Sequence, residues 1–289
     1  EQDRHRSDGP FPAGSWRDEA WLTYLSLTRA TDNPTLRQMQ DAALEQVAYY
    51  TVVAQWSQNP VAQADCSLDL DQDQQSECVL SSETWLGILE LDGGRLAFAA
   101  ARVGQETLPL IGSSSQRSLG LGEPAEWQPE RGLAADPQVI PGAFADETYP
   151  WVTYQAEVNG TEIRLTNPQS DLVKTFRVNG GTFQVDSSPS MAMRIPIMAA
   201  PGGQLARGWQ PLLTRQGPDG ITIQVSEQYL LQFSAQKPGL LSSFDSAASL
   251  PVREDPNTGY PAGHYLPFPL ILVQAQTPLT LTITPGILR

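Results

Sequence analysis

Four acidic residues lie at spacings that calcium-binding loops use. Asp69, Asp71, Asp73 and Glu77 match the first, third, fifth and ninth ligand positions of an EF-hand loop. No glycine follows Asp73 to make the sharp turn, and the twelfth position holds Leu80 in place of a bidentate glutamate. We therefore expect a solvated acidic loop and no cofactor, with calcium binding by these four carboxylates as the alternative.

Cys66 and Cys78, the only cysteines of the chain, flank this acidic stretch. A disulfide between them would close a short loop and stabilise the fold by about 3 kcal/mol, because it restricts the unfolded chain. Disulfides persist in oxidising compartments, so a bridged pair predicts a secreted protein of the periplasm or the extracellular space. Two unrelated free thiols in a cytosolic protein are the alternative.

The histidine content argues against several kinds of active site. The chain has two histidines, His5 and His264, so a metal centre with several imidazole ligands is excluded. A Ser-His-Asp hydrolase would depend on His264, but the chain contains no G-x-S-x-G motif. Ser234 and Lys237 match the S-x-x-K pair of penicillin-interacting enzymes. They follow a predicted strand and precede Pro238, so no helix would bring the two side chains together.

Carboxylates and aromatic residues of the C-terminal half form the remaining candidate sites. Glu157, Glu162 and Glu227 lie on predicted strands, where two carboxylates could cleave a glycosidic bond or could simply be solvated. Tryptophan can stack on a sugar ring, although core packing is its usual role. The side chains that we expect to line a ligand site are Trp151, Trp209, Tyr260, His264 and Tyr265.

The charge balance excludes some classes of partner. The chain has 32 acidic and 18 basic residues and a formal net charge of −14, which repels nucleic acid phosphates and anionic lipid. We therefore expect no nucleic acid partner. No stretch approaches the roughly 18 consecutive apolar residues of a transmembrane helix, so we expect no membrane span within this chain.

The N-terminal residues carry helix signals in two places. Ser15 and Asp18 form a variant of the capping box ahead of apolar residues at helical spacing. Pro34 suits the first turn of a second helix, whose apolar residues recur every three or four positions until Pro60. We predict a helical pair in this part of the chain.

The period of the apolar residues changes after residue 84. Apolar segments on both sides of Asp92-Gly93-Gly94 predict a hairpin, because these turn residues accept positive φ angles. Turn dipeptides followed by alternating apolar and polar residues predict further hairpins near residues 157, 177 and 218. This alternation indicates a sheet with one buried and one solvated face, which is typical of antiparallel sheets.

These elements predict an α+β fold, in which an N-terminal helical pair is followed by a predominantly antiparallel β-sandwich of hairpins. Pro267, Pro269 and Pro278 interrupt the C-terminal strands and favour edge positions, because proline lacks a backbone donor. The predicted segments are the helices in 1–62, the cysteine loop and a hairpin in 63–103, a Gly/Pro/Ser-rich excursion or linker in 104–150 and the β-sandwich in 151–289.

The function class that fits these features is a non-catalytic binding or assembly module outside the cytoplasm, which recognises a protein, a peptide or a glycan. It fits because the sequence lacks a recognisable catalytic motif and its predicted sheet faces are rich in Thr, Gln and aromatic residues. Two alternatives stay open. One is a carbohydrate-active enzyme with two strand-borne carboxylates, and the other is a structural component of a pilus, a secretion machine or a membrane-insertion machine.

Overall fold

The structure is a computed structural model of the whole chain. The residues that it describes are 17, 18, 21, 24, 25, 28, 34–72, 74–112, 143–146, 148–149, 152–197, 213–217, 220–226, 228–235, 241–244 and 270–288. They form one complete helix, α2 (Pro34–Gln58), and sixteen strands. The helix begins at the proline expected in its first turn. Of the first predicted helix only isolated positions are described, so the helical pair stays a prediction.

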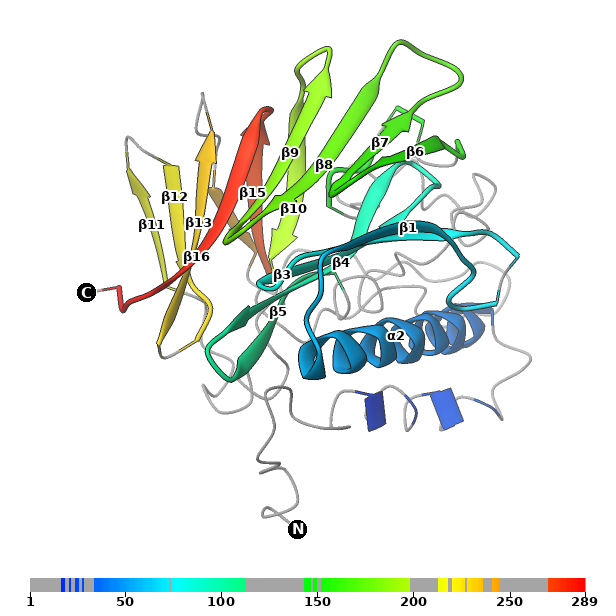
Figure 1. The fold of residues 1–289 in the computed structure, drawn as a ribbon, viewed down its shortest axis with the longest axis horizontal. Helices are drawn as coiled ribbons and strands as arrows, with labels where there is room; N and C mark the ends of the chain where they lie inside the picture. Colours follow the sequence, from blue (N-terminus) through cyan, green and yellow to red (C-terminus); the bar gives the residue numbers. More distant parts are fainter. Residues whose placement is uncertain are drawn as a thin grey trace.

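The strands form two eight-stranded sheets (Figure 1). Sheet 1 contains, in spatial order, β1 (Gln63–Leu68), β2 (Glu77–Ser81), β3 (Trp85–Glu90), β4 (Arg95–Val103), β5 (Glu106–Gly112), β10 (Ala192–Ile197), β15 (Leu270–Gln276) and β14 (Leu241–Phe244). Sheet 2 contains β11 (Thr214–Gly217), β12 (Gly220–Gln224), β13 (Tyr229–Ala235), β16 (Leu279–Pro285), β9 (Thr182–Ser188), β8 (Val173–Asn179), β7 (Glu162–Thr166) and β6 (Gln155–Asn159). Every described strand pair is antiparallel, so the predicted predominance of antiparallel β-structure is confirmed.

The predicted hairpin around residue 92 joins β3 to β4. Gly93 and Gly94 have φ angles of 66° and 53°, which L side chains rarely adopt. Gly94 is required for a second reason, because a Cβ atom there would lie 2.9 Å from the ring of Tyr154. The hairpins predicted near residues 157, 177 and 218 are also present, as the pairs β6–β7, β8–β9 and β11–β12.

The expected edge position of the C-terminal strands is wrong. β15 lies between β10 and β14, and β16 lies between β13 and β9. Both strands can occupy interior positions because Pro278 lies in the turn between them, where no ladder hydrogen bond requires its nitrogen. Sheet 1 contains strands from the predicted segment 63–103 and strands from the predicted segment 151–289. The division of the chain into these segments stays a prediction.

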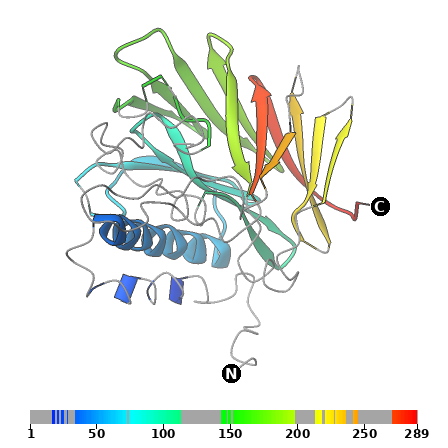
Figure 2. The same cartoon turned by 180° about the vertical axis from the view of Figure 1, so that it is seen from behind.

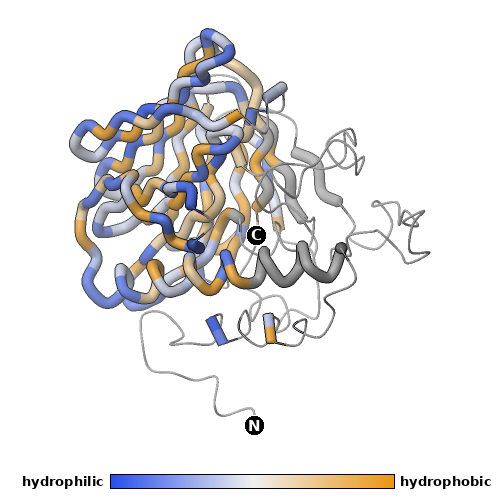
Figure 3. Tube along the Cα trace, turned by 90° about the vertical axis from the view of Figure 1, so that its right-hand side faces the viewer, coloured by the Kyte–Doolittle hydropathy of each residue, from blue (hydrophilic) through white to orange (hydrophobic). Residues whose placement is uncertain are grey.

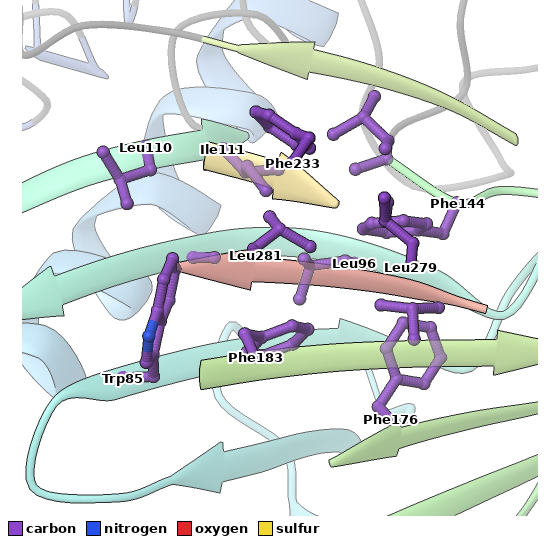
Figure 4. Close-up of a cluster of buried hydrophobic side chains, with 14 of the residues drawn as sticks. Trp85, Leu96, Leu110, Ile111, Phe144, Phe176, Phe183, Phe233, Leu279 and Leu281 are labelled. Atoms are coloured by element: carbon purple, nitrogen blue, oxygen red, sulfur yellow. The ribbon is translucent and has the colours of Figure 1, made fainter. Parts of the chain in front are cut away.

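The two sheets share one hydrophobic core, to which both contribute alternate side chains (Figure 4). Figure 3 follows this alternation of hydrophilic and hydrophobic residues along the strands. Trp85 and Leu96 of sheet 1 lie against Phe176 and Phe183 of sheet 2, and the Trp85 and Phe183 ring centroids are 5.8 Å apart. Gly87 allows this approach, because a Cβ atom there would lie 2.8 Å from the Phe183 ring.

Helix α2 covers the outer face of sheet 1 and forms a second core with it (Figures 1 and 2). The ring of Tyr50 meets that of Phe98 edge to face, with centroids 5.8 Å apart. The indole nitrogen of Trp56 donates a hydrogen bond to the carbonyl of Ser82 over 2.8 Å. Among the described residues, no helix is both long and apolar enough to cross a membrane.

A fully buried lysine joins the two sheets. Lys174 of β8 points into the core and donates hydrogen bonds to the carbonyl oxygens of Gly93 (2.9 Å), Gly94 (2.9 Å) and Phe144 (2.7 Å). Its ammonium group lies 4.9 Å from the centroid of the Tyr154 ring, within reach of a cation–π interaction. The hydroxyl of Tyr154 donates to Asp146 over 2.6 Å. The lysine therefore ties the β3–β4 turn of sheet 1 to a strand of sheet 2.

Candidate functional site

The side chains that we expected to line a ligand site lie outside the described residues. This applies to Trp151, Trp209, Tyr260, His264 and Tyr265, and these assignments stay predictions. Asp73 of the acidic loop and the strand-borne carboxylate Glu227 also lie outside the described part of the chain. The candidates that the structure does place are the outer face of sheet 2, the acidic loop and a buried cluster of carboxyl groups.

The outer face of sheet 2 carries two rows of polar side chains, and each row is in register across six neighbouring strands. We call these two rows together the polar face. The first row runs from β11 to β8 and consists of Arg215, Thr222, Gln232, Thr282, Thr182 and Asn179. The second runs from β13 to β6 and consists of Ser234, Thr280, Gln184, Arg177, Glu162 and Asn159. All of these residues are partly or fully exposed.

This face follows from the strand pattern of the sequence. Residues 279, 281 and 283 of β16 are buried leucine and isoleucine, whereas the threonines between them point to the other side. Neighbouring strands lie roughly 4.8 Å apart, so a six-strand row spans about 24 Å. Among the described outward positions of sheet 2 there is no aromatic residue, so a ligand on this face would find no ring to stack on there.

Two of the three candidate carboxylates for glycoside cleavage, Glu157 and Glu162, are described, and both are engaged with arginines. Glu157 of β6 lies opposite Arg164 of β7, and their charged atoms are 3.5 Å apart. Glu162 of β7 accepts a hydrogen bond from the guanidinium of Arg177, which lies opposite it on β8. The two carboxyl groups of a glycosidase face one another across the scissile bond, whereas each of these carboxylates faces an arginine on the next strand. The described neighbours of Glu157 and Glu162 therefore do not favour a catalytic pair.

The disulfide between Cys66 and Cys78 is present and joins the paired strands β1 and β2. It closes the neck of the acidic loop, as expected from the cysteine spacing. Within the loop, Asp69 accepts the backbone N–H of Gln74, and Glu77 accepts that of Leu70. These two carboxylates therefore hold the loop backbone in shape.

Three of the four candidate calcium ligands come together in this loop. Carboxylate oxygens of Asp69, Asp71 and Glu77 all lie within 4.8 Å of one another. Asp69 is exposed, Asp71 is half-buried and Glu77 is buried. Two of these groups already accept backbone N–H donors, an arrangement that an acidic loop adopts without a metal ion, and calcium binding remains the alternative.

Removing the disulfide should destabilise the protein by about 3 kcal/mol, because the unfolded chain regains the freedom of a loop of this length. The variant is Cys66→Ala with Cys78→Ala, and urea denaturation with and without reductant measures the effect. Reductant should lower the midpoint of the wild type to that of the variant and leave the variant unchanged. Equal midpoints in the oxidised wild type and the variant would show that the bridge contributes nothing.

A cluster of buried carboxyl groups lies between α2 and sheet 1. We call Glu45 of α2, Glu77 of β2 and Glu90 of β3 the carboxyl cluster. Arg95 of β4 is buried beside it, and the hydroxyl of Tyr49 donates a hydrogen bond to Glu90. Burial raises the pKa of Glu90 to about 8, with a further rise from Glu45 and Glu77, against the opposing effects of Arg95 and the Tyr49 hydrogen bond.

This cluster was not among the predicted sites, although the sequence contains one signal of it. Glu45 and Tyr49 are four residues apart, so they share a face of the helix, and Val53 continues that face. A glutamate in line with buried apolar residues is an unusual occupant of that face. Glu90 ends an otherwise apolar strand, where a glutamate is ordinarily solvated.

Comparisons with known proteins found little similarity. No protein family model matches the sequence, and no curated protein is similar to it. Among solved structures, the crystal structure of a 4-alpha-glucanotransferase from Thermococcus litoralis aligns with 92% of this chain and 48% of its own. The alignment has a TM-score of 0.39 and 10% sequence identity, and at that level it carries no argument about fold or function. This chain thus spans about half the length of that structure.

Proposed function

We propose that this protein is a non-catalytic binding module that works outside the cytoplasm, in the periplasm or the extracellular space, and recognises a glycan with the polar face of sheet 2. We further propose that the two sheets act as a single β-sandwich, which holds this face rigid. The observation that carries the proposal is the pair of unbroken polar rows, each in register across six strands. The disulfide supports the compartment.

A regular polar face suits a regular polar partner. Hydroxyl and amide groups donate and accept hydrogen bonds, as sugar hydroxyls do, and a row of them repeats at the strand spacing. The charges within the two rows comprise Arg215, Arg177 and Glu162, so the face presents both signs and suits an uncharged polymer. A neutral glycan is both a regular polar polymer and uncharged. A protein or a peptide is the alternative partner.

The absence of favourable carboxylate geometry among the described residues supports a binding role over an enzymatic one. Glu157 and Glu162 both have arginine partners, and a pair of carboxylates facing one another across a groove is not found in the described part of sheet 2. The structural role in an envelope machine has no specific support in the described residues. Binding is therefore the function that we put to the test.

The test is a glycan array followed by calorimetric titration of the hits. Replacing Gln184 and Thr282 by alanine removes one group from each row, and each lost hydrogen bond costs about 0.5–1.5 kcal/mol. We expect the double variant to bind the glycan roughly tenfold more weakly. The matched control is Gln55→Ala, which truncates an exposed glutamine on α2 and should leave the affinity unchanged.

The outcomes separate the possible partners. If the double variant and the wild type bound the glycan with equal affinity, the polar face would not be the binding site. If the array is silent but an envelope protein is captured, and the double variant captures less of it, the partner is a protein. Silence in both assays would contradict a binding module.

A further inference from the structure

The turn between β6 and β7 carries the sequence of an N-glycosylation acceptor. Asn159, Gly160 and Thr161 spell N-x-T, the sequon in which an asparagine receives a sugar when the middle residue is not proline. Residues 33–35 have the same outer residues, but a proline between them breaks the rule. Asn159 is therefore the single asparagine of the chain that meets the whole sequon.

This turn is accessible in the folded protein. Asn159, Gly160 and Thr161 are all exposed. Gly160 has a φ angle of 63°, which lets the chain reverse, and a Cβ atom added there would meet no atom within 4 Å. β6 is the last strand of sheet 2, so the turn lies at a corner of that sheet (Figure 1). A modifying enzyme can therefore reach it without opening the core.

The two chemical groups that the sequon supplies are not engaged elsewhere. Among the described residues, neither the carboxamide of Asn159 nor the hydroxyl of Thr161 makes a hydrogen bond. The backbone is fixed by the pairing of Asn159 with Glu162 across the hairpin. The turn thus presents a free carboxamide nitrogen and, two residues later, a free hydroxyl.

The compartment is the second condition for this modification. Sequons are used on the surface loops of secreted proteins. The bridge between Cys66 and Cys78 supports an oxidising compartment, so the inference rests on the location that we proposed above. It does not depend on whether the polar face binds a glycan.

We propose that Asn159 carries an N-linked glycan in the exported protein. The donor is an oligosaccharide that is joined through its anomeric carbon to a lipid diphosphate. The Nδ2 atom of Asn159 forms a bond to that carbon, and the bond from the carbon to the phosphate oxygen breaks. The lipid diphosphate leaves with the electron pair, and one Nδ2 proton passes to a base of the transferase. The sugar then stands at the β6 end of the second polar row.

The β8–β9 turn is a matched site that lacks one group. Asn179 and Gly180 occupy the equivalent positions, both are exposed, and Gly180 has a φ angle of 54°. Gly181 stands where the first turn has its threonine, so we expect Asn179 to stay unmodified. Gly181→Thr completes the sequon, and a Cβ atom at this position meets no atom within 4 Å.

Mass spectrometry of the protein isolated from the cells that make it tests this proposal. Trypsin releases residues 132–164 and 178–194, which contain Asn159 and Asn179 as their respective single asparagines. The first peptide should gain the mass of an oligosaccharide, and fragmentation should place the sugar on Asn159. The second peptide should be unmodified. Thr161→Ala, made in the same cells, should lose the sugar, whereas Thr161→Ser should keep it.

Gly181→Thr keeps the test independent of how well Thr161→Ala folds, because it should add a second sugar on Asn179. A Gly181→Thr protein without that sugar would contradict the role of the hydroxyl. An unmodified Asn159 in the wild type would overturn the proposal, and so would a sugar that Thr161→Ala retains.

The same sample separates this failure from a failure of the proposed function. If the cysteines are bridged and Asn159 is unmodified, the glycan is rejected and the compartment is kept. Free thiols together with an unmodified Asn159 would reject both. Binding by the polar face is judged by the glycan array, whose result does not change the mass of either peptide.

Discussion

Replacing Lys174 by methionine should destabilise the protein by about 3–5 kcal/mol, one of the two largest effects that we expect from a single substitution. The ammonium group donates to the carbonyl oxygens of Gly93, Gly94 and Phe144, and all of these contacts are buried. Methionine fills a similar volume but donates no hydrogen bond. Three buried acceptors then lose their donor, and each such loss costs about 1–3 kcal/mol before relaxation.

The measurement is the free energy of unfolding from urea denaturation, with the slope of the transition compared between the variants. The matched control is Thr175→Met, which introduces the same side chain at the neighbouring, outward-facing position of β8. This control should change the free energy by less than about 0.5–1 kcal/mol. If Lys174→Met changed the free energy of unfolding by no more than this control, the three carbonyls would have found other donors.

The sequence predicted the local elements of this fold well. Helix α2 begins at Pro34 and ends at Gln58, next to the Asn-Pro pair that was expected to stop it. The β3–β4 turn and the disulfide are also where the sequence placed them. Each of these features depends on residues close together in the chain, so short-range chemistry determines them.

The pairing of distant strands could not be predicted in the same way. The alternation of apolar and polar residues in β16 predicts that one face of this strand is buried, but it does not predict that β13 and β9 are its neighbours. That choice depends on how all the strands share a single core. Proline near the C-terminal strands suggested edges, because the sequence does not show that Pro278 lies in a turn.

The buried charges escaped prediction for a related reason. Lys174 occupies an inward position between Leu172 and Phe176, where the alternation predicts an apolar residue. Its burial becomes possible only because a turn from the other sheet presents three carbonyl oxygens to it. Likewise Glu90 is buried because α2 covers it, and the sequence does not say which strands the helix covers.

Replacing Gly220 by alanine should destabilise the protein by at least about 3 kcal/mol, through a clash with the backbone of the neighbouring strand. A Cβ atom at this position would lie 1.9 Å from the carbonyl oxygen of Phe233, which belongs to the neighbouring strand β13. The φ angle of +134° is also one that alanine rarely adopts. The variant must therefore shift β12 away from β13 at the end of the strand pair.

Gly181→Ala is the matched control for this prediction, because a Cβ atom there meets no atom within 4 Å and its φ angle is not positive. Alanine restricts the unfolded chain, so this substitution should leave the stability unchanged or raise it by about 0.4–1 kcal/mol. Thermal and urea denaturation compare the two variants, and hydrogen exchange in β12 and β13 locates the damage. Equal effects at the two positions would contradict the prediction, whereas a loss confined to Gly220→Ala, with faster exchange in β12 and β13, would support it.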